Sequence, residues 1–101
     1  MKKKIFVKVH ESSRKLVAIC DSELVGKKFV EGDFQLEINK HFYEGDGMPE
    51  EEIVKLINLL KKESPSYNIV GERAVSLCLK ENLIEEVGVK KISGIPHAMI
   101  F

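Results

Sequence analysis

The chain has 101 residues, of which 44% are hydrophobic and 32% are charged, and its formal net charge at pH 7 is zero. This length suits one hydrophobic core rather than two, so we expect a single domain spanning residues 1–101. The balanced charge argues against a strongly basic nucleic-acid domain, and no run approaches the ~20 apolar residues of a membrane span.

The first third of the chain predicts two β-hairpins. Alternation over residues 5–9 and the apolar run 16–20 predict two paired strands. Asp21 suits the N-cap of a single helical turn that Gly26 would end. Segments 27–30 and 34–38 flank Gly32-Asp33, a pair that favours a tight turn. Segment 41–47 is predicted to be a loop, because two glycines and an aspartate interrupt any period.

Two amphipathic helices are predicted in the second half. The first, about 49–62, has a broad apolar stripe, Pro49 at its first position and three glutamates near its start, and Ser64-Pro65 ends it. The second spans about 72–82. Residues 87–101 predict one or two further strands, broken at Gly94 and Pro96. Together these elements predict an α+β fold, with a mixed or antiparallel sheet of four to six strands and two main helices.

The two cysteines, Cys20 and Cys78, lie far apart and form no CxxC pair or dense framework. A reducing compartment is the usual setting for such thiols. The apolar run after the N-terminal lysines is too short for a signal peptide. We therefore expect a cytoplasmic protein with no membrane association.

Charge is distributed unevenly along the chain. Residues 1–28 carry eight Lys or Arg against three acids, whereas residues 29–52 carry one against eight. A basic face could contact phosphates if the fold keeps these segments apart, although most such lysines are simply solvated. The candidate patch contains the lysines at positions 2–4 with Lys8, Arg14, Lys15, Lys27 and Lys28. Our first hypothesis is therefore a non-enzymatic binding module for RNA or a translation-associated protein.

A second hypothesis is a small enzyme or ligand-binding protein. Cys20 follows a strand and precedes a helical turn, where amide dipoles favour a thiolate; the alternative is a buried apolar side chain beside a capping Asp21. The turn from Asn68 to Gly71 could present N–H groups to an anion. His97 is constrained by Pro96, or is simply a surface histidine of an edge strand. The residues of the expected cleft are Cys20, Asp21, Asn68, Gly71 and His97.

No metal or cofactor is predicted. His10, His41 and His97 with Cys20 match no zinc-ligand spacing, and the acidic residues 44–52 lack the order of a calcium loop. A third hypothesis is a homo-oligomer, in which an unpaired terminal strand ending in residues 99–101 adds to a partner's sheet.

Four segments carry a resemblance to a known family. They are residues 20–27 (CDSELVGK), 42–45 (FYEG), 68–71 (NIVG) and 94–98 (GIPHA). In this order they resemble the motifs of an archaeal family described as domain of unknown function 424, over nearly the whole chain. The resemblance implies an archaeal cytosolic protein without an assigned activity. It singles out Cys20, Asp21, Gly26, Tyr43, Asn68, Gly71, Pro96 and His97. If the four segments meet in space they indicate a site; if not, they are caps, turns and packing glycines.

Overall fold

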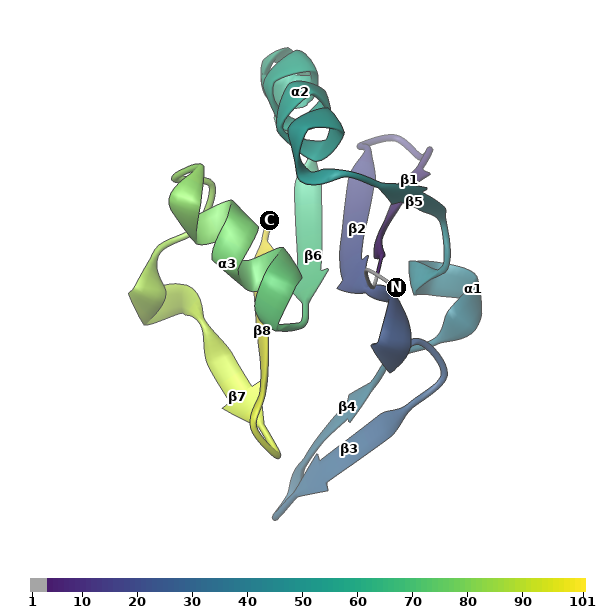
Figure 1. Cartoon of the computed structure of the whole chain (residues 1–101), viewed down its shortest axis with the longest axis vertical. Helices are drawn as coiled ribbons and strands as arrows, with labels where there is room; N and C mark the ends of the chain where they lie inside the picture. The colour runs from purple at the N-terminus through teal and green to yellow at the C-terminus, as the bar shows by residue number, and fades with distance from the viewer. Residues whose placement is uncertain (1–3) are drawn as a thin grey trace.

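The computed structural model describes residues 4–101, which form a six-stranded mixed sheet, a separate two-stranded hairpin and two principal helices (Figure 1). The predicted α+β class is confirmed. Lys2 and Lys3 of the predicted basic patch lie outside the described residues. The strands are β1 (Ile5–His10), β2 (Leu16–Asp21), β3 (Lys28–Glu31), β4 (Phe34–Glu37), β5 (Asp46–Met48), β6 (Ser66–Val70), β7 (Lys90–Ile92) and β8 (Ile95–Ile100). The helices are α1 (Lys40–Tyr43), α2 (Glu50–Leu60) and α3 (Glu72–Lys80).

The large sheet has the strand order β5-β1-β2-β6-β8-β7. The predicted hairpins are both present, as β1 with β2 and as β3 with β4. β2 and β6 are parallel, and the other neighbouring pairs are antiparallel. Parallel strands need a crossover connection. Here the crossover contains the β3–β4 hairpin, α1, β5 and α2.

α2 and α3 pack on one face of this sheet (Figure 1). Their apolar stripes bury Ile53 and Ile57 of α2 and Leu77 of α3 against Val17 and Ile19 of β2. Burial of each such side chain contributes roughly 1.5–3 kcal/mol, so this layer supplies most of the core. Within residues 4–101, no helix is both long enough and apolar enough to cross a membrane.

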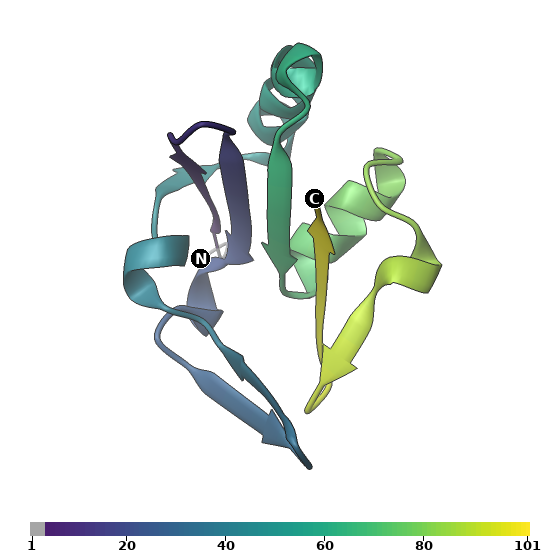
Figure 2. The same ribbon diagram turned by 180° about the vertical axis from the view of Figure 1, so that it is seen from behind.

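The opposite face of the sheet is free of α2 and α3 (Figure 2). Alternate residues of β2, Ala18 and Cys20, point to this side and form a second, smaller core with Val70. Tyr43 of α1 and Leu36 of β4 pack against it. Because α1 and the hairpin cover only part of this face, the remainder is left to line cavities.

The predicted loop at residues 41–47 is wrong, since the structure has α1 and the edge strand β5 there. Asn39 starts α1 by accepting hydrogen bonds from the amides of His41 (2.8 Å) and Phe42 (3.3 Å). Gly45 does not interrupt the regular structure of this segment. It lies so close to β1 that a Cβ there would be 2.3 Å from the carbonyl oxygen of Val7. This glycine lets the chain pass close to β1, which then pairs with β5.

Three smaller predictions differ from the structure. Pro49 is the N-cap of α2 rather than its first residue, and Ser64 ends the following 3-10 turn with a left-handed φ of 45°. Pro96 does not break the last strand but lies within β8, opposite Lys91. The terminal strand is also not unpaired, because β8 pairs with β6 on one side and with β7 on the other.

Candidate functional site

Asp21 and Gly71 meet at the start of α3. The two Asp21 carboxylate oxygens accept the backbone N–H groups of Arg73 (3.0 Å) and Ala74 (2.9 Å). Gly71 occupies the N-cap position of α3 with a φ of 109° and has no side chain to make these bonds. Asp21 makes no side-chain hydrogen bond to the turn at residues 22–24, contrary to prediction. The anion expected at this helix start is therefore the chain's own carboxylate.

Arg73 extends this arrangement. Its guanidinium donates to both carboxylate oxygens of Glu23 (2.7 and 2.8 Å) and to the carbonyl oxygen of Lys4 (2.9 Å). Such bidentate pairs are stronger and more directional than single ion pairs. Burial raises the pKa of the Asp21 carboxyl, against the lowering effect of its amide donors and of Arg73. These groups hold α3 to the end of β2, and we assign them a structural role.

Gly26 and Pro96 also serve the fold. Gly26 has a φ of 86°, which disfavours other residues, and its N–H donates to the Ile38 carbonyl (2.7 Å). The Pro96 carbonyl accepts the Gly71 N–H (2.9 Å). This backbone hydrogen bond joins the Gly71 turn to β8.

Cys20 is a buried thiol rather than an activated one. Its side chain is 0% exposed, and its Sγ lies 3.3 Å from the Asp21 carbonyl oxygen. Burial raises its pKa to about 12, so the group is protonated at neutral pH. Of the two interpretations of Cys20, the buried apolar side chain is confirmed and the thiolate is wrong, because desolvation and the charges of Asp21 and Glu23 all raise the pKa of the thiol.

The motif segments do converge on the helix-free face. Cys20, Val70 and His97 lie side by side across β2, β6 and β8. Asn68 is opposite Met99, so Asn68 and His97 are diagonal neighbours on one face, roughly 7–8 Å apart. The expected five-residue cleft is not formed, because Cys20 and Asp21 are buried and Gly71 packs against Asp21. Asn68 and His97 remain half-buried, and Tyr43 lines a cavity together with Asn68.

A cavity of ≈ 570 Å³ lies between the β3–β4 hairpin and the end of the large sheet. We call it the hairpin cleft. Its lining residues are Glu31, Phe34, Lys90, Lys91, Ile92 and His97. The Phe34 side chain is 70% exposed, although it is a large aromatic group. Pairing of Lys90 with His97 places these two side chains on the same face of the β7–β8 ladder.

His97 brings a half-buried imidazole to this cleft. Its Nδ1 is buried and has no hydrogen-bond partner among residues 4–101. Burial lowers the pKa of the imidazole from its ordinary value of 6.5, against a smaller opposing effect of the Ile95 backbone. The ring is therefore neutral at pH 7, and a neutral imidazole can donate from one nitrogen and accept at the other.

The tips of the two hairpins close one end of the cleft. The backbone N–H of Ser93 donates to the Glu31 carboxylate (2.8 Å), and its hydroxyl donates to the Val30 carbonyl (2.9 Å). Ser93 adopts a left-handed φ of 51° in the β7–β8 turn. These two bonds join the β3–β4 tip to the β7–β8 turn, so the cleft is bounded on several sides.

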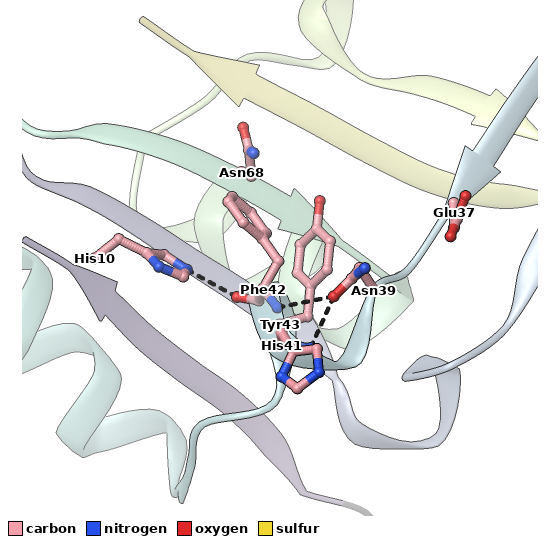
Figure 3. Close-up of a pocket in the computed structure, with 7 residues that line it drawn as sticks. All are labelled: His10, Glu37, Asn39, His41, Phe42, Tyr43 and Asn68. Carbon is pink, nitrogen blue, oxygen red and sulfur yellow. Dashed lines mark hydrogen bonds between the residues drawn. The ribbon is translucent and has the colours of Figure 1, made fainter.

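A second cavity, of ≈ 540 Å³, lies beside α1 on the same face (Figure 3). We call it the α1 groove. It is lined by His10, Glu37, Asn39, His41, Phe42, Tyr43 and Asn68. The His10 and Phe42 rings stack with centroids 4.5 Å apart, and Tyr43 meets Phe42 edge-on at 4.8 Å. Among residues 4–101, no three His, Cys, Asp or Glu side chains are placed to hold a metal ion.

The cations predicted as a basic patch lie at different places. Lys8 donates to the His41 carbonyl and holds α1 on β1. Arg14 donates to the Ser64 carbonyl (3.0 Å), and Lys15 pairs with Glu63 (2.7 Å), both before β2 begins. Lys27 and Lys28 come after the other end of β2, about 20 Å away along a six-residue strand. The structure thus does not gather them on one surface.

Sequence reasoning passed over Phe34, Lys90 and Asn39. In the sequence, Phe34 falls within the predicted strand 34–38 and Lys90 within the predicted strands of residues 87–101, and neither belongs to a motif. A phenylalanine directly after a Gly-Asp turn was a usable signal, since hairpin tips extend from the core and leave side chains exposed. Asn39 directly before the predicted loop carried the signature of an N-cap.

Comparison with known proteins places the chain in a family. A family model described as "Protein of unknown function (DUF424)" matches residues 10–101. The chain belongs to this family. A search of curated proteins found no match. The crystal structure of an uncharacterized conserved protein from Methanopyrus kandleri has a TM-score of 0.84 with 23% identity, covering 96% of this chain and 90% of that one. At this identity the likeness concerns the DUF424 fold alone.

Proposed function

We propose that this DUF424 protein is a non-enzymatic binding module for single-stranded RNA, which takes one nucleotide into the hairpin cleft. The observation that carries the proposal is an exposed aromatic ring, Phe34, in the same cleft as the cation Lys90 and the half-buried imidazole of His97. Single-stranded RNA is bound by stacking of bases on aromatic rings, with cations along the backbone.

Each group of the cleft has a counterpart in a nucleotide. The Phe34 ring offers a stacking surface to a base, and Lys90 offers a charge to its phosphate. The half-buried imidazole of His97 offers a hydrogen-bonding group to a ribose hydroxyl or a base edge. The Glu31 carboxylate would repel a phosphate, but this carboxylate already accepts a hydrogen bond from the Ser93 N–H.

The absence of an enzymatic role is supported by what the candidate catalytic groups do in the fold. The Cys20 thiol has a pKa of about 12 and no exposure, and the Asp21 carboxylate caps α3. Neither group is available to a bound substrate. Nucleophilic and acid–base catalysis both require such groups within reach of the reacting atoms.

The test is fluorescence anisotropy with a labelled single-stranded RNA of about ten nucleotides, titrated at several salt concentrations. We expect Phe34→Ala to weaken binding by about 5–150-fold, since stacking of a base is worth about 1–3 kcal/mol. Lys90→Glu should weaken binding and flatten its salt dependence. The matched control is Lys55→Glu, an exposed lysine of α2 on the opposite face.

Two results would overturn the proposal. One is no binding at low salt by the wild-type protein. The other is binding that Phe34→Ala leaves unchanged and that Lys55→Glu weakens as much as Lys90→Glu, because this would indicate non-specific attraction to surface lysines. If a mononucleotide bound with the same affinity as the RNA, the ligand of the cleft would be a free nucleotide and not RNA.

We also propose that the protein acts in the cytoplasm. The support is its two cysteines, which are both buried and unpaired. Proteins of oxidising compartments usually use their cysteines in disulfides. Fractionation of cells, with antibody detection of the protein, tests this location, and recovery from a secreted or membrane fraction would contradict it.

A further inference from the structure

The α1 groove has an aromatic wall that is formed before any ligand arrives. His10 Nε2 lies 2.9 Å from the Phe42 carbonyl oxygen, and the two rings stack at an interplanar angle of 20°. The Lys8 ammonium donates to the His41 carbonyl. Three bonds or ring contacts from β1 therefore fix α1, so the wall needs no ordering on binding, which lowers the cost of association.

The polar groups of the groove are also oriented by the fold. The Asn39 oxygen accepts two amide hydrogens at the start of α1, so its NH₂ group is the part left for a ligand. The Tyr43 hydroxyl and the Asn68 amide point toward the same side of the groove (Figure 3). Burial raises the pKa of Tyr43 to about 12, so its hydroxyl is uncharged at neutral pH.

The charge of the groove selects the kind of ligand. Among the described residues 4–101, its lining contains no Lys or Arg side chain, and it contains the exposed carboxylate of Glu37. A phosphate or carboxylate in this space would be repelled by Glu37, and the nearby Lys8 ammonium already donates to the His41 carbonyl. A neutral, planar ligand that donates a hydrogen bond to Glu37 would be favoured instead.

We propose that the α1 groove binds an adenine or cytosine base, presented by the nucleotide next to the one in the hairpin cleft. This inference rests on the proposed RNA binding and adds a second base site to it. The two cavities adjoin, because Asn68 of the groove and His97 of the cleft are diagonal neighbours on β6 and β8. One strand of RNA can therefore occupy both.

The preference for adenine and cytosine follows from hydrogen-bonding patterns. Each of these bases carries an exocyclic amino group beside a ring nitrogen that accepts a hydrogen bond. The Glu37 carboxylate can accept a hydrogen bond from such an amino group. The Asn68 amide lies at the other end of the groove, where it can pair with another polar atom of the nucleoside (Figure 3). Uracil has a carbonyl oxygen in place of that amino group, which would face the Glu37 carboxylate.

The test compares two labelled RNAs, oligocytidine and oligouridine of equal length, on the wild-type protein and on Glu37→Gln and Asn68→Ala. We expect the wild-type protein to bind oligocytidine about tenfold more tightly, since a hydrogen bond to a charged group is stronger than a neutral one. Glu37→Gln should reduce this ratio toward one, and Asn68→Ala, which removes an amide that can pair with either base, should weaken binding of both oligomers alike. The matched control is Glu81→Gln, an acidic residue that follows α3 on the other face.

A second measurement separates this inference from the proposed function. In NMR spectra, millimolar cytidine should shift the side-chain NH₂ signals of Asn39 and Asn68, and uridine should shift them less. If RNA binds through Phe34 and Lys90 but with equal affinity for the two oligomers, the second base site is wrong and the proposed function stands. If cytidine shifts the two amides but no RNA binds, the groove takes a free nucleoside and the proposed function is wrong.

Discussion

The carboxylate of Asp21 fills the space that a side chain on Gly71 would need. A Cβ added to Gly71 would lie 2.4 Å from the Asp21 Cγ, and the glycine has a φ of 109°. The cap of α3 thus comes from the neighbouring part of the sheet, 50 residues earlier in the chain, because its own N-cap residue has no side chain. Two of the four family motifs meet in this one contact.

The Gly71 contact predicts a large loss of stability in Gly71→Ala. Both the positive φ and the collision with Asp21 act against the new methyl group, and we expect a loss of about 3 kcal/mol or more in the free energy of unfolding. Gly88→Ala is the matched control, since a Cβ there meets nothing within 4 Å. Urea denaturation followed by circular dichroism measures both. Equal effects of the two substitutions would contradict this account.

Replacement of the cap itself should also destabilise the protein. Asp21→Ala leaves the Arg73 and Ala74 amides without acceptors, and the expected cost is about 2–4 kcal/mol. Asp33→Ala, in the exposed turn between β3 and β4, should change the stability by less than about 0.5 kcal/mol. If Asp21→Ala were as stable as the wild-type protein, water or another side chain would have to cap α3.

The buried thiols predict resistance to alkylation and to disulfide reagents. Cys20 and Cys78 are both buried, with pKa values raised to about 12 by desolvation. In a DTNB assay the native protein should react only as fast as it unfolds locally, and the denatured protein should release two equivalents of thiolate. Fast reaction of one equivalent in the native state would show that Cys20 or Cys78 is accessible.

The bonds of Ser93 predict how the hairpin cleft opens. Ser93→Ala removes the hydroxyl that donates to Val30, which should favour opening by about 1 kcal/mol. Hydrogen exchange at the β3–β4 amides should then quicken about fivefold, while exchange in β2 and β6 stays the same. Ser13→Ala, in the exposed turn between β1 and β2, is the control. Unchanged exchange in Ser93→Ala would mean that the hairpin is held elsewhere.

His97 predicts a pH dependence of stability. Its folded-state pKa lies below the unfolded value near 6.5, so the unfolded chain binds the proton more tightly. The contribution of neutral His97 is therefore complete above pH 6.5 and is lost as pH falls through the folded-state pKa. The melting temperature of His97→Gln should fall less steeply than that of the wild-type protein below pH 6.5. If an NMR titration gave the His97 imidazole a pKa above 6.5, the predicted pH dependence of stability would have the opposite sign.

Local sequence patterns were sufficient for most of the fold. The alternation at 5–9, the apolar run at 16–20 and the stripe of α2 each follow from a period that the residues themselves display, and the structure contains all three elements. The prediction of a loop at residues 41–47 was wrong because the strand there depends on a contact between Gly45 and Val7 of β1, which lies 38 residues earlier. No local period records such a contact.

For the site, the sequence alone pointed to the motif segments that contain Tyr43, Asn68 and His97, and also Asp21 and Gly71. Only the tertiary structure decided which of them serve the fold and which line a cavity. The difference comes from burial and hydrogen bonding. The Asp21 carboxylate caps α3, and desolvation keeps the Cys20 thiol protonated. The pairing of β6 with β8 then brings Asn68 and His97 together, across a separation in the chain that no sequence motif spans.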